Sequence, residues 1–419
     1  MSNTKYAALV EAAKQQRKGR LNLALEAIAF DSASGAAISL QTLAEELDAI
    51  NQHITVNADE FDDAASDYNQ IAERLVEKLH WPNDAIRVIP QGSSSTKTLI
   101  RAPDRSKFDI DAVCAVDISK IEAKDPMAFF EKIGEALEDW NPSAKKRCWC
   151  VEFTNRRYYI EFTPSVPLNT IPAQAVASIR YRPSDRYSDT ALAVVDTPKA
   201  QWKTSNPEGF SNWVSDQAKR TILVSLFLEK HAMEALASDS VAPVPEQLVP
   251  LSDTLRVAIR LLKRHRDMSV RRGLFDAKLK PISVIIVTLL TQCYEGLADQ
   301  DARYSNPIEL LADLTQLMPG MIEIRNGEYW IENPTVDEEN FAEKWNDNHK
   351  LKEVFDNWCE QLIDDLQSIL SSTDERSLSE NMRRVFGCTA ATGSVPPSSS
   401  GLASRAPDRV HKVPARGLA

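Results

Sequence analysis

The chain has 419 residues, 43% of them hydrophobic and 26% charged, with a formal net charge of −11 at pH 7. This composition is ordinary for a soluble globular protein of about two or three domains. The acidic balance argues against a protein that wraps long nucleic acid nonspecifically, because that role needs a basic surface.

Targeting and membrane signals are also missing from the sequence. The N-terminus has no signal-peptide pattern, and the longest apolar run, Val284 to Leu290, is too short to span a bilayer. The six cysteines match no zinc-binding spacing. We therefore expect a reduced, cytoplasmic protein with no membrane partner.

The first half of the chain predicts an α/β unit that follows an N-terminal helical extension, for which the helical pattern is weak. An amphipathic helix is expected from about residue 57 to 79, where apolar residues recur at helical spacing. These residues are Phe61, Ala64, Tyr68, Ile71, Leu75 and Leu79. The following elements are strands at Ile86–Ile89 and Phe108–Ile118, a helix at Asp125–Asp139, and a hairpin of Cys148–Phe153 and Tyr158–Phe162.

The second half of the chain is expected to be mostly helical. The expected helices are Ser211–His231, Ser252–Met268, Pro281–Leu297, Pro307–Leu317, Glu338–Asn348, His349–Ser371 and Ser377–Val385. A tail rich in Ser, Pro, Gly and Ala follows and is expected to be disordered. The expected domains are an N-terminal helical extension (1–55), an α/β core (56–195), a helical domain (196–386) and the tail (387–419).

Two acids in the second expected strand are candidate metal ligands. Asp109 and Asp111 stand two residues apart, so in a strand both side chains point to one side. Asp-x-Asp alone also fits an exposed strand edge. Here the strand is otherwise apolar, where uncompensated charge is costly, and Glu161 ends another expected strand. Two Mg²⁺ ions need three or more carboxylates and phosphate oxygens, so the trio predicts a two-metal site.

Four further residues are candidate phosphate contacts. Gly92 lets the backbone approach a phosphate closely and Ser93 adds a hydroxyl, although the same pair occurs in ordinary turns. Lys263 continues an apolar helix stripe, so its ammonium either snorkels outward or points toward a triphosphate. Ser283 lies near the N-terminus of a helix expected to begin at Pro281, as a phosphate contact or a simple cap.

No Walker pattern surrounds Lys97 and Thr98, which argues against a P-loop NTPase. His265, a lone histidine in a basic helix, is expected to be exposed or packed rather than catalytic. Arg264 and Arg266 are expected at the surface or in ion pairs.

The pattern of Gly92-Ser93, Asp109-Ile110-Asp111 and Glu161 resembles the polymerase-β-like nucleotidyltransferase superfamily. More closely, the chain is similar over about residues 56–350 to the bacterial cGAS/DncV-like nucleotidyltransferases (CD-NTases). These are relatives of cyclic GMP–AMP synthase and oligoadenylate synthase. The stretches that carry the resemblance are Glu161–Ser165, Trp202–Phe210 with Trp213, Leu261–Asp267, Lys280–Leu289, and Asn333–Pro334 with Phe341–Trp345.

The resemblance implies an α+β fold: a polymerase-β-like core with a mixed β-sheet, joined to an all-helical C-terminal domain around a central cleft. It implies an enzyme that joins ATP and a second NTP into a cyclic di- or trinucleotide messenger of the CBASS antiphage system, releasing pyrophosphate. Two Mg²⁺ ions, or Mn²⁺ in their place, are the implied cofactors. The implied catalytic metal ligands are Asp109, Asp111 and Glu161, and the implied nucleotide contacts are Gly92, Ser93, Lys263, Ser283 and Lys203.

The chain departs from the family in two ways. The third acid is usually Asp rather than Glu161, and the gap between Ser93 and Asp109 is long, which predicts an inserted turn at Arg101–Lys107.

Other interpretations stay open. One is a nucleotidyltransferase acting on a macromolecular acceptor such as RNA, although the acidic balance favours no obligate nucleic acid. Another is a non-catalytic scaffold, against which the three intact acids argue. Some CD-NTases are joined through their C-terminus to target proteins by ubiquitin-type conjugating enzymes. Ala419 is therefore either a conjugation terminus, or a site for another operon-encoded regulator, or a frayed end.

Overall fold

The structure is a computed structural model that describes residues 4–34, 38–57, 59–104, 106–121, 125–171, 179–223 and 246–390. The expected tail lies outside the described residues from residue 391 onward, and Ala419 with it. In the parts of the chain that are described, no helix is long and apolar enough to cross a membrane.

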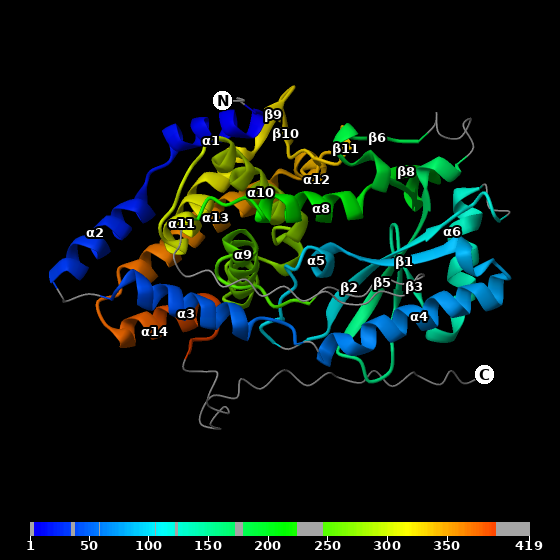
Figure 1. Cartoon of the computed structure of the whole chain (residues 1–419), viewed down its shortest axis with the longest axis horizontal. Helices are drawn as coiled ribbons and strands as arrows, with labels where there is room; N and C mark the ends of the chain where they lie inside the picture. Colours follow the sequence, from blue (N-terminus) through cyan, green and yellow to red (C-terminus); the bar gives the residue numbers. More distant parts are fainter. Residues whose placement is uncertain are drawn as a thin grey trace, which may run out of the picture.

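The chain forms two lobes, one around a β-sheet and one of helices (Figure 1). The seven-stranded sheet has the order β1-β2-β5-β4-β3, with β7 pairing β5 and β8 pairing β7. Its strands are β1 (Ile86–Gln91), β2 (Phe108–Val116), β3 (Ser143–Ala144), β4 (Trp149–Val151), β5 (Tyr158–Pro167), β7 (Leu192–Asp196) and β8 (Gln201–Ser205). β2 and β5 run parallel, and the other pairs antiparallel. The α+β fold with a mixed sheet is confirmed.

Helices α4 (Asp59–Leu79) and α6 (Pro126–Ala136) pack against one face of the sheet in a common apolar cluster. Alternate residues of β2 from Ile110 to Val116 belong to this cluster. Because side chains alternate along a strand, Asp109 and Asp111 must point to the opposite face. The helices therefore decide which face carries the acids.

The helical lobe has one apolar cluster that also includes the N-terminal extension. Its helices are α1 (Lys5–Gln16), α2 (Arg20–Ser34), α3 (Leu40–His53), α8 (Pro207–Ala218), α9 (Thr254–Arg271), α10 (Ser283–Asp299), α11 (Pro307–Leu317), α12 (Glu343–Asp347), α13 (His349–Leu370) and α14 (Glu375–Phe386). α1 lies against Gly296 of α10, where a Cβ atom would overlap the backbone of Tyr6. The extension is thus part of the helical lobe.

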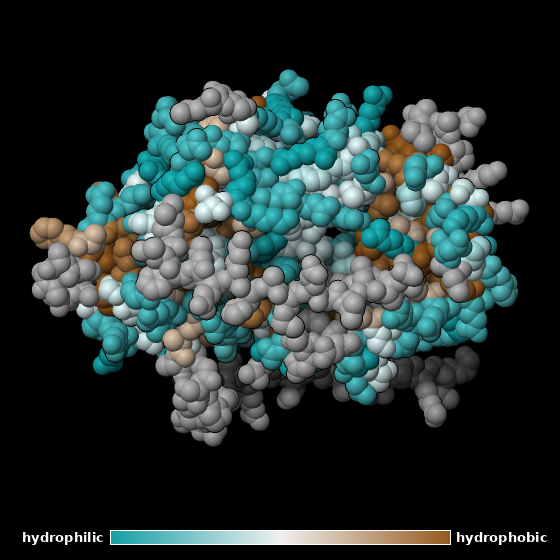
Figure 2. All heavy atoms as spheres, in the orientation of Figure 1, coloured by the Kyte–Doolittle hydropathy of each residue, from teal (hydrophilic) through white to brown (hydrophobic). Residues whose placement is uncertain are grey.

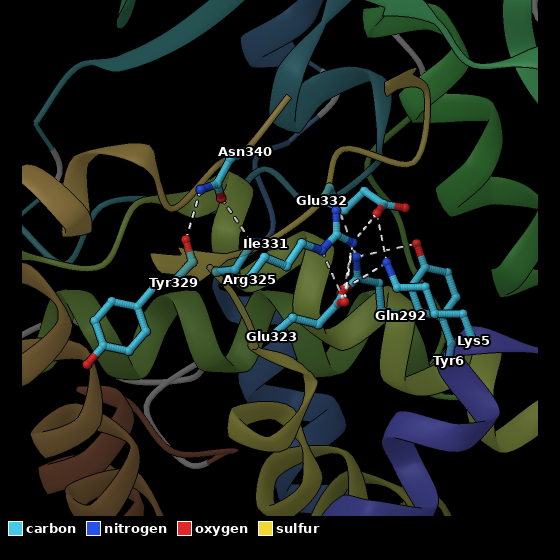
Figure 3. Close-up of polar contacts among 9 residues, drawn as sticks. All are labelled: Lys5, Tyr6, Gln292, Glu323, Arg325, Tyr329, Ile331, Glu332 and Asn340. Carbon is cyan, nitrogen blue, oxygen red and sulfur yellow. Dashed lines mark hydrogen bonds and ion pairs between the residues drawn. The ribbon is translucent and has the colours of Figure 1, made fainter. Parts of the chain in front are cut away.

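A segment of residues 323–341 connects the helical lobe to the sheet lobe. It contains the hairpin of β9 (Glu323–Arg325) and β10 (Glu328–Trp330), and then β11 (Val336–Asp337), which pairs with β6 (Arg182–Pro183). Lys5 of α1 pairs with Glu323 and Glu332 at 2.7 Å each (Figure 3). The segment is thereby anchored to α1 at one end and to β6 at the other.

Most expected elements are present, but two expected helices are wrong in extent. Residues 338–348 were expected to be helical, yet only the short α12 forms there. The Asn340 side chain bonds the backbone of Tyr329, Ile331 and Ala342, and such bonds compete with helix formation (Figure 3). α8 begins at Pro207, because Asn206 caps it, and ends at Ala218. Part of the expected Ser211–His231 helix lies outside the described residues.

Three boundaries also differ from the expectation. The sheet continues to Ser205 through β8, beyond the expected core boundary at residue 195. β5 continues to Pro167 by pairing with β7, so Glu161 lies in the middle of its strand rather than at the end. α10 begins at Ser283, and Pro281 precedes it.

His265 is packed inside the helical lobe, as one of the two expected environments. Trp358 donates its indole N–H to His265 Nδ1 at 3.0 Å, so Nε2 carries the proton and faces Asp365 Oδ2 at 2.9 Å. Arg272 and Arg384 also donate to Asp365. Burial, together with these two guanidinium groups, lowers the pKa of His265 although Asp365 opposes this. The buried imidazole is therefore neutral.

This network predicts a pH-dependent stability. In the unfolded chain His265 has an ordinary pKa of about 6.5. Below this pH the unfolded chain therefore binds a proton on His265 that the folded state does not bind. The contribution of His265 to stability should therefore fall as pH drops from about 7.5 to about 5.5. His265→Gln should cost about 1–3 kcal/mol at pH 7.5, because Trp358 and Asp365 lose a buried partner, and should flatten this pH dependence. Thermal unfolding measured across this pH range tests both effects.

His349→Gln is the matched control, because His349 is exposed at the start of α13. It should leave the pH dependence of the melting temperature unchanged. A His265→Gln protein that keeps the full pH dependence would contradict the assignment.

Candidate functional site

A cavity of about 790 Å³ lies between the two lobes. In the space-filling view the middle of the visible face is recessed, and the atoms seen there are mostly hydrophilic (Figure 2). Both lobes and the 323–341 segment line this cavity. Its polar lining includes Gly92, Ser93, Asp109, Asp111, Tyr159, Lys263, Arg266, Lys280, Ser283, Asn333 and Glu339.

Asp109 and Asp111 supply the acidic side of the cavity from β2. Asp111 pairs with Gln91 of β1 on one side and with Glu161 of β5 on the other. The turn after β1 passes close to it: Gly92 has φ +63°, and a Cβ atom there would overlap the Asp111 carboxylate. Glycine is therefore required at this position both by the backbone conformation and by the approach of the acid.

The two carboxylates have no direct side-chain partner in the described part of the chain. Burial, with the negative charges of Asp109 and Glu161, raises the pKa of Asp111 to about 8. Within the described residues, neither Asp109 nor Asp111 has a side-chain hydrogen bond or ion pair. Carboxylate oxygens are the donors that Mg²⁺ prefers, with phosphate oxygens completing its shell. These two residues therefore fit a magnesium site.

Glu161 is arranged differently from the other two acids. It lies beside Asp111 in the sheet, but its carboxylate pairs with Lys145 and accepts a hydrogen bond from Cys148 Sγ at 3.6 Å. Glu161 is not among the cavity-lining residues. In the described part of the chain, no three His, Cys, Asp or Glu side chains are placed to hold a metal ion. The structure thus places two of the three expected ligands in the cavity.

The cationic side comes from α9 and the residues before α10. Lys263 is buried and donates to Ser93 Oγ at 2.9 Å and to the Thr98 carbonyl at 2.7 Å. Burial, with the nearby Arg266 guanidinium, lowers the pKa of Lys263 to about 7. A bound polyphosphate would favour its charged form. Of the two alternatives, Lys263 points inward rather than snorkelling to solvent.

Arg266 was expected at the surface or in an ion pair, and the surface alternative is wrong. It is buried, lines the cavity, and donates to Ser283 Oγ at 3.0 Å while pairing with Asp267 at 2.7 Å. Lys280 lies 3.8 Å from the same aspartate and also lines the cavity. Together with Lys263 these side chains give the cavity an excess of positive charge opposite the acids.

Two other basic residues lie away from the cavity lining. Arg264 is buried and donates to the backbone carbonyls of Phe386 and Arg101, so its expected surface position is wrong. Lys203 is buried in an ion pair with Glu339, which does line the cavity. Asn333 donates to the other carboxylate oxygen of Glu339 at 2.7 Å. Lys203 therefore orients Glu339 rather than lining the cavity itself.

Sequence reasoning missed Lys145, Arg266 and Glu339 as site residues. The basic run Lys145–Arg147, directly before an expected strand, was a usable signal for the first. Arg266 follows Lys263 by three residues on the same helix, which places both on one face. Glu339 gave no signal, because it lies in a segment expected to be helical.

Comparisons with known proteins agree with this architecture. Residues 86–164 match the family model for the nucleotidyltransferase domain of cyclic GMP-AMP synthase DncV-like proteins. A c-di-GMP synthase of Roseivirga ehrenbergii is 23% identical over 303 residues, which are 72% of each chain.

Two solved structures share the fold. CD-NTase CdnG of Bradyrhizobium diazoefficiens, in complex with GTP, has a TM-score of 0.53 at 17% identity, covering 84% of this chain and 96% of that one. CdnC of E. coli MS115-1, in a CdnC:HORMA-deltaN complex, has a TM-score of 0.50 at 14% identity, covering 80% and 93%.

Gly92→Ala tests the turn that supports Asp111. The new Cβ should displace the carboxylate and weaken binding of a magnesium-loaded, nonhydrolysable nucleoside triphosphate by about tenfold or more. It also places alanine in the left-handed region, at a cost of about 1–2 kcal/mol in stability. Calorimetric titration and thermal unfolding measure the two effects separately.

Gly273→Ala provides the control, because Gly273 has φ +75° and nothing within 4 Å of an added Cβ. It should lose similar stability and keep its nucleotide affinity. Equal nucleotide affinity in both variants would show that the contact with Asp111 is unimportant.

Proposed function

We propose that the chain is a nucleotidyltransferase of the DncV-like CD-NTase family and that it joins two nucleoside triphosphates into a cyclic dinucleotide, which the family match at residues 86–164 and the similarity to a c-di-GMP synthase support. The observation that carries the proposal is that one cavity holds both Asp109 and Asp111, which are unpaired among the described residues, and a group of cations around Lys263. A magnesium-loaded triphosphate complements both halves of such a cavity.

Asp109 and Asp111 would hold Mg²⁺, or Mn²⁺ in its place. When bound, the metal lowers the pKa of the attacking ribose hydroxyl and stabilises the charge of the departing pyrophosphate. Lys263, Arg266 and Ser283 would bind the donor triphosphate and align its α-phosphorus for attack. The hydroxyl oxygen forms a new bond to this phosphorus as the bond to the β-phosphate breaks, and a second transfer closes the ring.

GTP is our proposed substrate, in place of or beside the ATP expected from the sequence. The Roseivirga relative is a c-di-GMP synthase, and the CdnG structure contains GTP. The carboxylate of Glu339 lines the cavity and complements the amino donor on the edge of guanine. Phe210 and Phe341, also in the lining, meet edge to face at 6.1 Å and offer an apolar surface for a base.

We propose that the product acts as a second messenger in antiphage defence, as the CBASS resemblance implies. The E. coli CdnC structure is a complex with a HORMA protein. A protein regulator of this kind, a ubiquitin-type conjugating enzyme acting at Ala419, and a cytoplasmic location stay predictions.

Synthesis from nucleotides alone tests the function. The protein should convert labelled GTP, with or without ATP, into a phosphatase-resistant product when Mg²⁺ is present. Mass spectrometry gives the bases and ring size, and nuclease P1 sensitivity reports the linkage. Asp109→Asn and Asp111→Asn should each lower the rate by about a hundredfold or more, because transition-state charge loses its stabilisation.

Asp84→Asn is the control, since Asp84 is an exposed acid of the sheet lobe paired with Lys120. It should retain full synthesis. A product that forms only on added RNA would favour the macromolecular-acceptor alternative, and full synthesis by Asp111→Asn would overturn the site.

Lys263→Met tests the triphosphate contact. The variant should bind GTP about tenfold more weakly, while its affinity for guanosine stays close to that of the unaltered protein, because only the phosphate interaction is lost. Equilibrium titrations with both ligands measure this difference. Lys278→Met, an exposed lysine before α10, should change neither affinity. Equal losses for GTP and guanosine would place Lys263 at the base instead.

A further inference from the structure

Glu161 differs from its two acidic neighbours in having protein partners on both carboxylate oxygens. Oε1 pairs with the Lys145 ammonium, and Oε2 accepts from Cys148 Sγ at 3.6 Å. Asp111, its direct neighbour across the parallel β2–β5 pair, has no such partner among the described residues. The third acid is therefore beside the metal site but bonded to the protein.

The position of Lys145 is fixed by the turn between β3 and β4. Its backbone N–H donates to the Cys148 carbonyl at 2.8 Å, which closes the turn next to β5. Its ammonium lies 5.3 Å from the centre of the Tyr159 ring. Tyr159 and Glu161 are two residues apart on one strand and share a face, so the ring and the carboxylate hold the ammonium together.

The strength of the Lys145–Glu161 ion pair determines how much it can change the affinity of the site for a metal ion. The side chains of Lys145 and Glu161 are 44% and 22% exposed. A pair this accessible is weak, and competition with it changes the affinity of another cation only about threefold to fivefold. It can therefore adjust metal binding, but it cannot block a divalent ion held by several carboxylates.

We propose that Lys145 is a positioning residue that competes with the divalent cation for Glu161. With Lys145 in place, Asp109 and Asp111 form a two-carboxylate site. When the ammonium leaves, Glu161 joins them as the third ligand. The inference rests on the proposed function, since it presupposes a metal at Asp109 and Asp111.

Mn²⁺ binding to the full chain without nucleotide, followed by electron paramagnetic resonance of free Mn²⁺, tests the proposal without measuring activity. Lys145→Met should bind Mn²⁺ about threefold to fivefold more tightly, because Glu161 becomes available. Glu161→Gln should weaken binding little in the unaltered background and clearly more in the Lys145→Met background. The two substitutions are therefore expected to be coupled.

The double variant separates this effect from a general change of charge. If Lys145→Met tightens Mn²⁺ binding equally when residue 161 is Gln, the lysine acts only through its long-range field and the proposal is wrong. Lys120→Met removes a comparably exposed lysine from its pair with Asp84 and should leave Mn²⁺ affinity unchanged. An equal gain from Lys120→Met would likewise overturn the proposal.

Asp111→Asn distinguishes this inference from the proposed function. Loss of Mn²⁺ binding in that variant, with no coupling between residues 145 and 161, refutes the role of Lys145 alone. Unchanged Mn²⁺ binding in Asp111→Asn refutes the metal site itself, and the inference with it.

Discussion

The site depends on the two-sided nature of β2. One face of this strand is buried under α4 and α6, and Asp109 and Asp111 lie on the other face. Burial, with the negative charges of Asp109 and Glu161, raises the pKa of Asp111 to about 8. Such a site lowers the stability of the ligand-free protein, because a largely buried carboxyl group, that of Asp111, lies beside two other acids. The bound cation would supply the missing charge, which links folding of the core to binding of substrate.

Local sequence patterns were sufficient for most of the fold. Alternation in β2 placed both acids on one face, and helical periodicity located α9, α11 and α13 with small errors at their ends. The patterns failed where side chains override local preference. The Asn340 side chain makes three hydrogen bonds to the backbone, and these hold its segment in a loop where a helix was expected. Hydrophobic periodicity cannot predict such bonds. β7 extends β5 past Glu161 by a pairing that the alternation of β5 alone does not encode.

The site was predicted only in part, because sequence patterns group residues that are near in the chain but not partners that are far apart. Gly92, Asp109 and Asp111 are close in sequence, so spacing alone was enough to group them. Lys263 donates to Ser93 across 170 positions, and only the resemblance to a known family suggested that both residues belong to one nucleotide site. The basic run at Lys145 was a signal for a site residue, but its pairing with Glu161 was not predictable, because the direction of the Lys145 side chain follows from the turn between β3 and β4. The residue types in the sequence therefore predict metal and phosphate binding, whereas contacts between distant segments determine which side chains meet in the site.

The N-terminal helices bear on how the protein is made. The apolar cluster of the sheet lobe uses one continuous stretch, from Val56 to Trp202, so that lobe can form as soon as this stretch leaves the ribosome. α1–α3 instead share their cluster with α8–α14. Translated first, these helices must wait for the last ones before their apolar faces are covered. Closing so long a loop slows assembly, and the apolar faces of α1–α3 therefore stay exposed to aggregation longer than those of the sheet lobe.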